Sequence, residues 1–453
     1  MPMRDRARWA LAFVFSMALL STPAIWNRFP LLQYDTGGYL ARWYEPYLVP
    51  SRAVAYGFVL NAGAILSFWP VVLGQSALTV WVIALLLRVH GLGGRPELLA
   101  GIVAALSVFS TLPWLTSILL TDIFAGLAVL ALYLLLLRTD EINGREQFGL
   151  VTLIAFSAAT HSATFAVLLM LLAGAALLSL VAPNRLPRRR LANGALAIAL
   201  GAALVFAINA TVTKRLTWTP GGFALSFGRM LQDGIVKKYL DEHCPRARLV
   251  LCAYKNELPH DADEWFWGSP LFDKLGRFAG LDAEMEHIAL ASLAEYPLLQ
   301  IKTALIATAR QLIDVRTGEG VVSSIWHTYG IIERYRPGLV TDMRAARQQR
   351  GEIGFTIINR VHYPVALACF LLLPLIAVRM LRRNSMSEVG ELAAVCLLAL
   401  LANASICGTL SNPHDRYGAR LIWLTVAVAA IAAVRLFQER RRRRAAALVP
   451  SPQ

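Results

Sequence analysis

Charged side chains are scarce in this chain of 453 residues. Only 16% of its residues are charged, whereas 57% are hydrophobic. An average soluble domain has about 25% charged residues, and one soluble core would not hide so much apolar surface. The composition therefore predicts an all-α protein that crosses a membrane several times, because apolar runs of about 20 residues span a bilayer as helices.

Acidic residues are especially few, since 29 Asp and Glu stand against 44 Lys and Arg, a net charge of +15. Such an excess could indicate nucleic acid, but the arginines gather at the ends of apolar runs. The clusters are Arg4, Arg6 and Arg8; Arg88 and Arg95; Arg188 to Arg190; Arg379, Arg382 and Arg383; and Arg440 to Arg444. This is the positive-inside pattern of short cytosolic loops, so we expect a lipid bilayer, and no nucleic acid, as partner.

Several catalytic sequence motifs are missing as well. The chain has no Walker loop, no GxGxxG after a strand, no HExxH and no GxSxG. Their absence argues against nucleotide-driven transport and against zinc proteolysis.

The apolar runs and basic clusters together predict about ten spans, with both termini in the cytosol. The expected spans are residues 9–26, 70–87, 98–112, 118–137, 148–160, 164–181, 191–210, 357–378, 389–407 and 421–437. A short half-helix at the outer surface is expected between Tyr56 and Pro70, because this stretch is too short for another pair of crossings. The first apolar run could also be a signal peptide, but no clear small-x-small cleavage site follows it, which favours a span.

This topology divides the chain into four regions. Residues 1–210 form an N-terminal membrane module whose first outer loop is 27–57, and residues 211–356 form an extracytoplasmic domain. Residues 357–437 form the C-terminal spans, and residues 438–453 form a basic cytosolic tail. The extracytoplasmic domain has 18 basic against 17 acidic residues between Lys214 and Glu352, unlike the cytosolic loops. Its periodicity predicts a mostly helical domain, in which Gln300 to Val315 could lie on the membrane.

Cysteine is also rare, with five residues. Three fall in or at the ends of expected spans, where cysteine behaves as a small apolar residue: Cys369, Cys396 and Cys407. Cys244 and Cys252 lie in the outer domain and are close enough in sequence to form a disulfide in an oxidising compartment. Reduced thiols, or metal binding together with His243 and His260, are the alternatives.

The first outer loop carries the main candidate site. Asp35 lies in the sequence YDTGGY, and Arg42 and Arg52 follow it on the same loop. An acid beside basic groups at a membrane surface is a candidate functional site, whereas a loop whose charges are merely solvated is the alternative. The further charged residues expected on the same side or at its edge are Asp122, His161, His414, Arg416 and Arg420.

The first 210 residues resemble the GT-C superfamily of polytopic membrane glycosyltransferases, which includes protein O-mannosyltransferases and the lipid A aminoarabinose transferase. The resemblance depends on Asp35 followed by Tyr39, and on the stretch SRAVAY from Ser51 to Tyr56 that leads into the half-helix. It also depends on LTDIFAG, from Leu120 to Gly126, at the start of the fourth span. Members usually have an Asp-Glu pair in the first loop, where Thr36 follows the acid here.

The resemblance implies a glycosyltransferase that moves a sugar from a polyprenyl-phosphate donor to an extracytoplasmic glycan, lipid or protein, in a bacterial cytoplasmic membrane. Asp35 would take the proton of the acceptor hydroxyl, and Asp122 would orient the acceptor or hold a divalent metal. The phosphate leaving group would need fixed positive charge or hydrogen-bond donors. The candidates for that role are Arg42, Arg52, His161, His414, Arg416 and Arg420. Tyr34 and Tyr39 are candidates for contact with the acceptor or the sugar.

Each candidate also has a structural interpretation. Asp122 could cap a helix that starts at Ile123, and His161 could be a buried, hydrogen-bonded histidine between two helices. Asp415 and Arg416 could form an ordinary interfacial ion pair. Two other functions remain open: a transporter or flippase for lipid-linked sugars, and a non-catalytic subunit of an envelope polysaccharide assembly complex.

Overall fold

The structure is a computed structural model that describes residues 3–45, 48, 52–181, 186–219, 221–383 and 386–447. Ser51, the first residue of the stretch SRAVAY, and the end of the basic tail, 448–453, lie outside these ranges. Within them every regular element is helical, apart from an isolated bridge between Leu31 and Ile118. The predicted all-α class is therefore confirmed.

The N-terminal half of the chain forms the helices α1 (Met3–Leu20), α2 (Thr22–Asn27), α3 (Tyr34–Ala41), α4 (Val54–Gly63), η1 (Ala64–Leu66), α5 (Trp69–Val89), α6 (Pro96–Phe109), α7 (Leu112–Ser117), α8 (Asp122–Leu137), η2 (Thr139–Glu141), α9 (Gly144–Thr160), α10 (Ser162–Val181) and α11 (Arg188–Thr213). The expected half-helix is α4 with η1. Pro70 lies in the first turn of α5, where its fixed φ suits a helix start and its missing N–H costs nothing.

The C-terminal half forms α12 (Gly222–Gln232), α13 (Ile235–His243), η3 (Val250–Tyr254), η4 (Glu264–Gly268), α14 (Pro270–Lys274), α15 (Arg277–Glu295), α16 (Pro297–Ile313), α17 (Trp326–Tyr335), η5 (Pro337–Leu339), α18 (Val340–Arg344), α19 (Thr356–Leu381), α20 (Ser387–Leu410) and α21 (Asp415–Ala447). Among the described residues, six helices are long and apolar enough to cross a membrane: α5, α10, α11, α19, α20 and α21. The chain is thus a multi-pass membrane protein. The helices α1, α6, α8 and α9 occupy the other expected positions, and the number of about ten spans stays a prediction.

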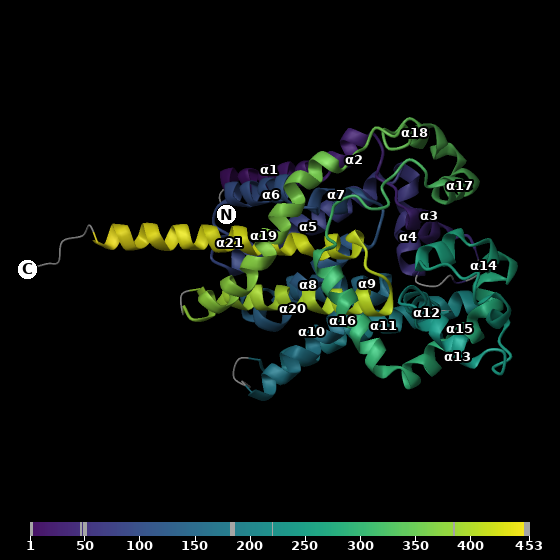
Figure 1. Cartoon of the computed structure of the whole chain (residues 1–453). Helices are drawn as coiled ribbons and strands as arrows, with labels where there is room; N and C mark the ends of the chain where they lie inside the picture. The colour runs from purple at the N-terminus through teal and green to yellow at the C-terminus, as the bar shows by residue number, and fades with distance from the viewer. Residues whose placement is uncertain are drawn as a thin grey trace, which may run out of the picture.

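The long helices lie together in a bundle, and both chain termini lie at the same end of it (Figure 1). Arginines of the expected cytosolic clusters form ion pairs near helix ends: Arg88 pairs with Glu146 at 2.6 Å, and Arg383 pairs with Glu439 at 3.4 Å. The short helices α3 and α4 gather at the opposite end together with the helices of residues 211–356, the outer segment, apart from α16, which packs against α20 (Figure 1). This arrangement agrees with an even number of crossings, while the side of the membrane stays a prediction.

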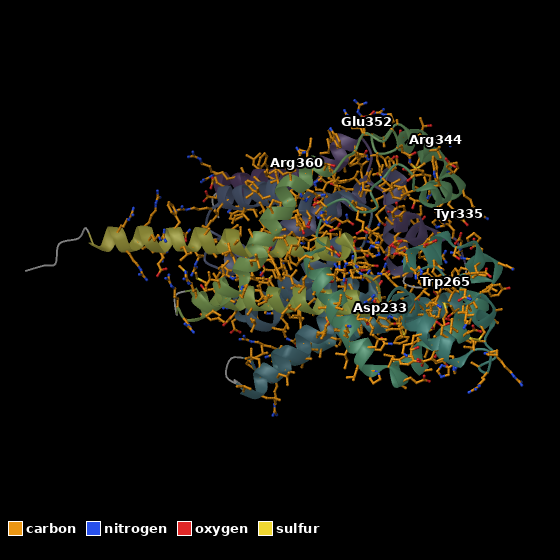
Figure 2. The ribbon with its side chains drawn as sticks, viewed as in Figure 1. Asp233, Trp265, Tyr335, Arg344, Glu352 and Arg360 are labelled. Carbon is orange, nitrogen blue, oxygen red and sulfur yellow. A yellow bond between two sulfur atoms is a disulfide. The ribbon has the colours of Figure 1, made fainter. Side chains whose placement is uncertain are left out.

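The predicted outer domain consists of two parts. Helices α12 to α15 surround a hydrophobic core of their own, in which Trp265 is fully buried. Helix α17 instead packs against α3, and its Tyr335 stacks on Tyr44 of the first outer loop with ring centroids 4.4 Å apart. Figure 2 labels Trp265 in the first part and Tyr335 in the second. The second part is therefore built onto the loop that carries Asp35.

The structure contains a disulfide between Cys244 and Cys252, which closes the loop after α13. The side chain of His243 lies 3.3 Å from the carboxylate of Glu295. In the ranges that the structure describes, no group of three or more His, Cys, Asp or Glu side chains could hold a metal ion. The two cysteines therefore tie the outer segment together covalently.

Candidate active site

A short backbone pairing brings the first outer loop beside the start of α8. The N–H of Leu31 donates to the carbonyl of Ser117, and the N–H of Leu119 donates to the carbonyl of Leu31, both at 2.9 Å. The hydroxyl of Thr36 donates to the carbonyl of Leu119 at 3.0 Å. These bonds hold the first turn of α3 next to the residues that precede Asp122.

Asp35 occupies the first turn of α3. The side chain of Gln33 caps this helix by accepting from the N–H of Asp35 at 2.8 Å, and the hydroxyl of Thr36 accepts from the N–H of Gln33 at 3.0 Å. This capping box satisfies N–H groups that a helix leaves without partners at its start. A carboxylate in the first turn is also favoured by the helix dipole. The sequence around Asp35 therefore forms a local structure that holds the acid in place.

Arg416, in the first turn of α21, joins the two candidate acids. Its Nη1 donates to Oδ2 of Asp35 at 2.5 Å, and its Nε donates to Oδ2 of Asp122 at 2.6 Å. The side chain of Asp122 is 5% exposed, and that of Arg416 is 12% exposed. Arg416 thus lies between two carboxylates that the expected topology had placed on the same side.

Arg52 contacts Asp35 from the other side. Its guanidinium forms an ion pair with Oδ1 of Asp35 and lies 6.0 Å from the ring centre of Tyr39. Gly38 faces Arg52, so no side chain separates α3 from the guanidinium. A narrow pocket of about 30 Å³ lies between α4, α9 and α11, and Arg52 forms part of its wall. That volume holds about one water molecule, so a larger ligand would require side chains to move.

Arg420 lies one helical turn after Arg416 and is fully buried. Its Nη2 donates to the Asn403 side chain at 2.5 Å, and its Nη1 lies 3.1 Å from Nδ1 of His161, the residue between α9 and α10. Within the described part of the chain, no carboxylate lies within ion-pair distance of Arg420. Burial, followed by the charges of Arg420 and Arg416, holds the pKa of His161 well below its usual value. His161 is therefore neutral near pH 7 and can accept from Arg420.

Three arginines and two aspartates form the centre of the cluster. The guanidinium groups of Arg52, Arg416 and Arg420 stand against the carboxylates of Asp35 and Asp122. Burial alone would raise the pKa of Asp35, but the charges of Arg52 and Arg416 lower it to about 2. Asp35 is therefore ionised at neutral pH.

A second set of residues fixes the turn before α21. His414 lies 2.7 Å from Glu319 through Nδ1 and 3.3 Å from Asp263 through Nε2. The other oxygen of Glu319 accepts from the backbone N–H of Arg416 at 2.6 Å. The sequence did not indicate Glu319 or Asp263 as site residues. The sequence does carry a local signal for Glu319, because two glycines, Gly318 and Gly320, flank it. Both have positive φ in the structure.

Two of the predicted site residues, Arg42 and Tyr39, are buried away from the expected contacts, whereas Tyr34 is exposed as expected. Arg42 is buried just after α3, where it pairs with Glu45. Tyr39 is also buried, and its hydroxyl lies 3.4 Å from that of Thr121. It therefore packs against the residue that precedes Asp122. Tyr34 is 52% exposed beside Asp35, where an acceptor could reach it.

Two structural alternatives from the sequence are wrong. Helix α8 starts at Asp122 itself, without a side-chain cap, and the carboxylate accepts from Arg416. Asp415 accepts from the N–H of Arg316 at 2.8 Å, so the expected pair of Asp415 with Arg416 is replaced by pairs with Asp35 and Asp122. The histidine interpretation agrees in part, since His161 is hydrogen-bonded between two helices but half-buried.

The two carboxylates do not fit a divalent metal in this arrangement. Such ions need several oxygen ligands that point at one place. Here the oxygens of Asp35 and Asp122 point at the nitrogens of Arg416. The fixed cation of the site is thus a guanidinium, and we derive no step that uses a metal.

Comparisons with known proteins show a structural likeness. No protein-family model matches the chain, and no curated protein matches it. Its structure is similar to that of the archaeal oligosaccharyltransferase AglB from Archaeoglobus fulgidus, solved in complex with an inhibitory peptide and a dolichol-phosphate. The identity is 14% and the TM-score 0.46; the match covers 100% of this chain and 52% of that one, so this chain spans about half its length.

Proposed function

We propose that this protein is a membrane glycosyltransferase that moves a sugar from a polyprenyl-phosphate donor to an acceptor outside the cytoplasmic membrane of a bacterium. The observation that carries the proposal is the cluster in which Arg416 lies between Asp35 and Asp122. It combines a possible base with the guanidinium groups of three arginines, at the end of the bundle where the outer segment gathers (Figure 1). The acceptor would be an envelope glycan, a glycolipid or a protein.

The positive groups suit the departing phosphate. Breaking the bond between sugar and phosphate leaves negative charge on the phosphate oxygen, and preorganised donors stabilise such charge strongly in a site that excludes water. Arg52 and Arg416 present guanidinium groups, which bind phosphate oxygens in pairs. Arg420 adds a buried charge with no carboxylate among the described residues within ion-pair distance. Together they match an anionic lipid headgroup better than a neutral substrate.

Asp35 would act as the general base in this reaction. Burial raises the pKa of Asp35, but the charges of Arg52 and Arg416 lower it to about 2. Asp35 is therefore a weak base before a donor binds. A general base works best when its pKa lies near the working pH. A donor phosphate that takes over the hydrogen bonds of Arg52 and Arg416 would weaken their hold on Asp35. The pKa of the carboxyl would then rise, so donor binding would itself prepare the base.

The atoms balance without a further reactant. The oxygen of the acceptor hydroxyl bonds to the anomeric carbon while the bond from that carbon to the phosphate oxygen breaks. The proton of the hydroxyl goes to Asp35, and the electron pair of the broken bond stays on the polyprenyl phosphate. Asp122 would hold Arg416 in position at 2.6 Å throughout.

The experiment is complementation in cells that lack this protein. Mass spectrometry of envelope glycans, glycolipids and proteins would first identify the missing sugar. The parent protein and Asp273→Asn, which changes an exposed carboxylate in α14, should restore it. Asp35→Asn keeps the shape but cannot take the proton, and loss of a general base typically lowers a rate by about 10²- to 10⁴-fold.

Membrane levels of the variants, measured by immunoblot, must match. Restoration of the sugar by Asp35→Asn at the parental rate would remove Asp35 from catalysis and make Asp122 the residue to test. Movement of a lipid-linked sugar across vesicles without covalent transfer would instead identify a flippase. An unchanged sugar profile in the absence of the protein would contradict the proposed reaction itself.

A further inference from the structure

Helix α16 has an unusual exposed face. Its exposed apolar side chains include Leu298, Ile301 and Leu305, which are 82%, 57% and 66% exposed, followed by Ile306 and Ile313 at 55% and 50%. Leu298, Ile301 and Leu305 follow one another at spacings of three and four residues, and Ile306 and Ile313 are about two turns apart, so the five side chains share one broad side of the helix. A helix that faces water normally presents polar residues on that side. The exposed face of α16 is therefore suited to an apolar environment.

The opposite face of α16 packs against α20, one of the helices long and apolar enough to cross a membrane (Figure 1). Ala307 of α16 is buried there against Gly408, where an added Cβ would lie 2.9 Å from the backbone of Ala307. Small residues of this kind let helices approach closely within a bilayer. On α20 itself, Leu401 and Leu410 are exposed at 42% and 55%. The apolar face of α16 thus adjoins a surface that already requires lipid.

The charges of α16 favour a membrane over water or a neutral protein surface. The helix contains Lys302 and Arg310 and no acidic residue. Both basic residues are exposed, on the same side as the leucines and isoleucines. Long basic side chains can place their stems along apolar surface and their charged ends among lipid phosphates. This combination of an apolar face with basic groups is typical of helices that lie in the membrane interface.

We propose that α16 is embedded in the lipid leaflet next to the candidate active site, with Leu298, Ile301 and Leu305 among the acyl chains and its two basic side chains at the headgroups. The exposed face of α16 is thus covered by the lipid bilayer. This inference does not depend on the reaction proposed above, because it uses only the packing and the exposed residues of the helix.

The embedded helix would support the active-site turn. Gln311, near the end of α16, donates to the carbonyl of His414 at 2.8 Å and accepts from its N–H at 2.9 Å. The carbonyl of Asp314 closely approaches Gly418, where an added Cβ would lie 2.1 Å from it. Because Arg416 lies between these two contacts, the depth of α16 would set the height of Arg416 above the bilayer.

The test is nitroxide labelling of single added cysteines in the full-length protein, purified and reconstituted into phosphatidylcholine vesicles. The labelled positions are Ile301→Cys and Leu305→Cys, with Glu286→Cys on the exposed side of α15 as the water control and Leu398→Cys of α20 as the lipid control. The parent protein provides the blank, since Cys396 and Cys407 are buried and Cys369 is half-buried. Collision with oxygen and with the polar complex nickel-EDDA is measured by electron paramagnetic resonance.

We expect labels at 301 and 305 to collide with oxygen and to be shielded from nickel-EDDA, as the label at 398 is. The label at 286 should show the reverse. Nickel-EDDA access at 301 and 305 equal to that at 286 would overturn the proposal, because the face would then be open to water or reserved for a partner protein absent from the vesicles. Transfer activity has no part in this measurement, so its outcome is separate from that of the proposed function.

Discussion

The guanidinium of Arg416 donates a hydrogen bond of 2.5 Å to the carboxylate of Asp35, a residue 381 positions earlier in the chain. The same group binds Asp122 at 2.6 Å. One side chain therefore connects the first outer loop, the start of α8 and the start of α21. Because the three side chains are largely buried, loss of this cation would remove the charge that the two carboxylates share and leave Asp35 with Arg52 as its ion-pair partner.

Replacement of Arg416 by Ala should reduce transfer strongly, by about 2 to 5 kcal/mol in transition-state stabilisation, because the lost charge is desolvated. Arg416→Lys should recover only part of the activity, since a point charge cannot replace the two-pronged guanidinium. Arg316→Ala, at a residue 51% exposed beside Asp415, is the control and should remain active. Transfer assays and thermal unfolding in lipid would be measured together. Normal donor use by both Arg416 variants would mean that this arginine only anchors the helix.

Gly37 and Gly38 should respond differently to the same substitution. A Cβ at Gly37 would lie 2.6 Å from the backbone of Thr328, whereas a Cβ at Gly38 would lie 3.4 Å from the Arg52 side chain, which can move. Gly37→Ala should therefore destabilise the protein by about 1 to 3 kcal/mol through overpacking of α3 against α17. Gly38→Ala should be close to neutral for stability, because Ala is the better helix former. Equal thermal stability of the two variants would contradict this packing.

His414 should make a pH-dependent contribution to stability. Burial opposes its protonation, but hydrogen bonds to Asp263 and Glu319 raise the pKa of His414 to about 10. An unfolded histidine has a pKa of about 6.5, so the folded protein binds this proton more tightly. The stabilisation is complete below a pH of about 6.5 and is lost as the pH rises through about 10.

The measurement is thermal unfolding in lipid nanodiscs, for the parent and His414→Gln, over this pH range. The difference in stability should be largest at the acidic end, shrink as the pH rises and become constant above the pKa of His414. His260→Gln, at an exposed histidine of the same outer segment, should show no comparable trend. A difference between parent and His414→Gln that does not change with pH would contradict the prediction.

Removal of the disulfide should destabilise the outer segment. The bond joins Cys244 and Cys252 across a separation of 8 residues. Closure of so short a loop lowers the conformational entropy of the unfolded chain and stabilises the folded protein by about 2 to 3 kcal/mol. Cys244→Ser with Cys252→Ser should lower the unfolding temperature, and Cys369→Ser serves as a control for loss of a thiol. Peptide mapping of the native protein without reductant that found both thiols free would disprove the bond.

The sequence by itself determined the elements that depend on local pattern. Apolar runs with basic ends predicted a helix at every expected span, and Pro70 marked the half-helix that precedes α5. The charge pattern also indicated that Asp35 and Asp122 lie on the same side. These features follow from the hydrophobicity and turn chemistry of neighbouring residues, which need no knowledge of the rest of the chain.

Only the tertiary structure decided which charges meet. Arg42 and Arg52 both follow Asp35 on one loop. Arg42 pairs with Glu45 just after α3, whereas Arg52, just before α4, pairs with Asp35. Glu319 and Asp263 reach His414 from two other parts of the outer segment. Such pairs depend on the distance between side chains far apart in the chain, and Coulomb attraction depends on that distance and on burial. Composition and spacing carry no record of either quantity, so the pairing of these candidates became visible only once α3, α8 and α21 were packed together.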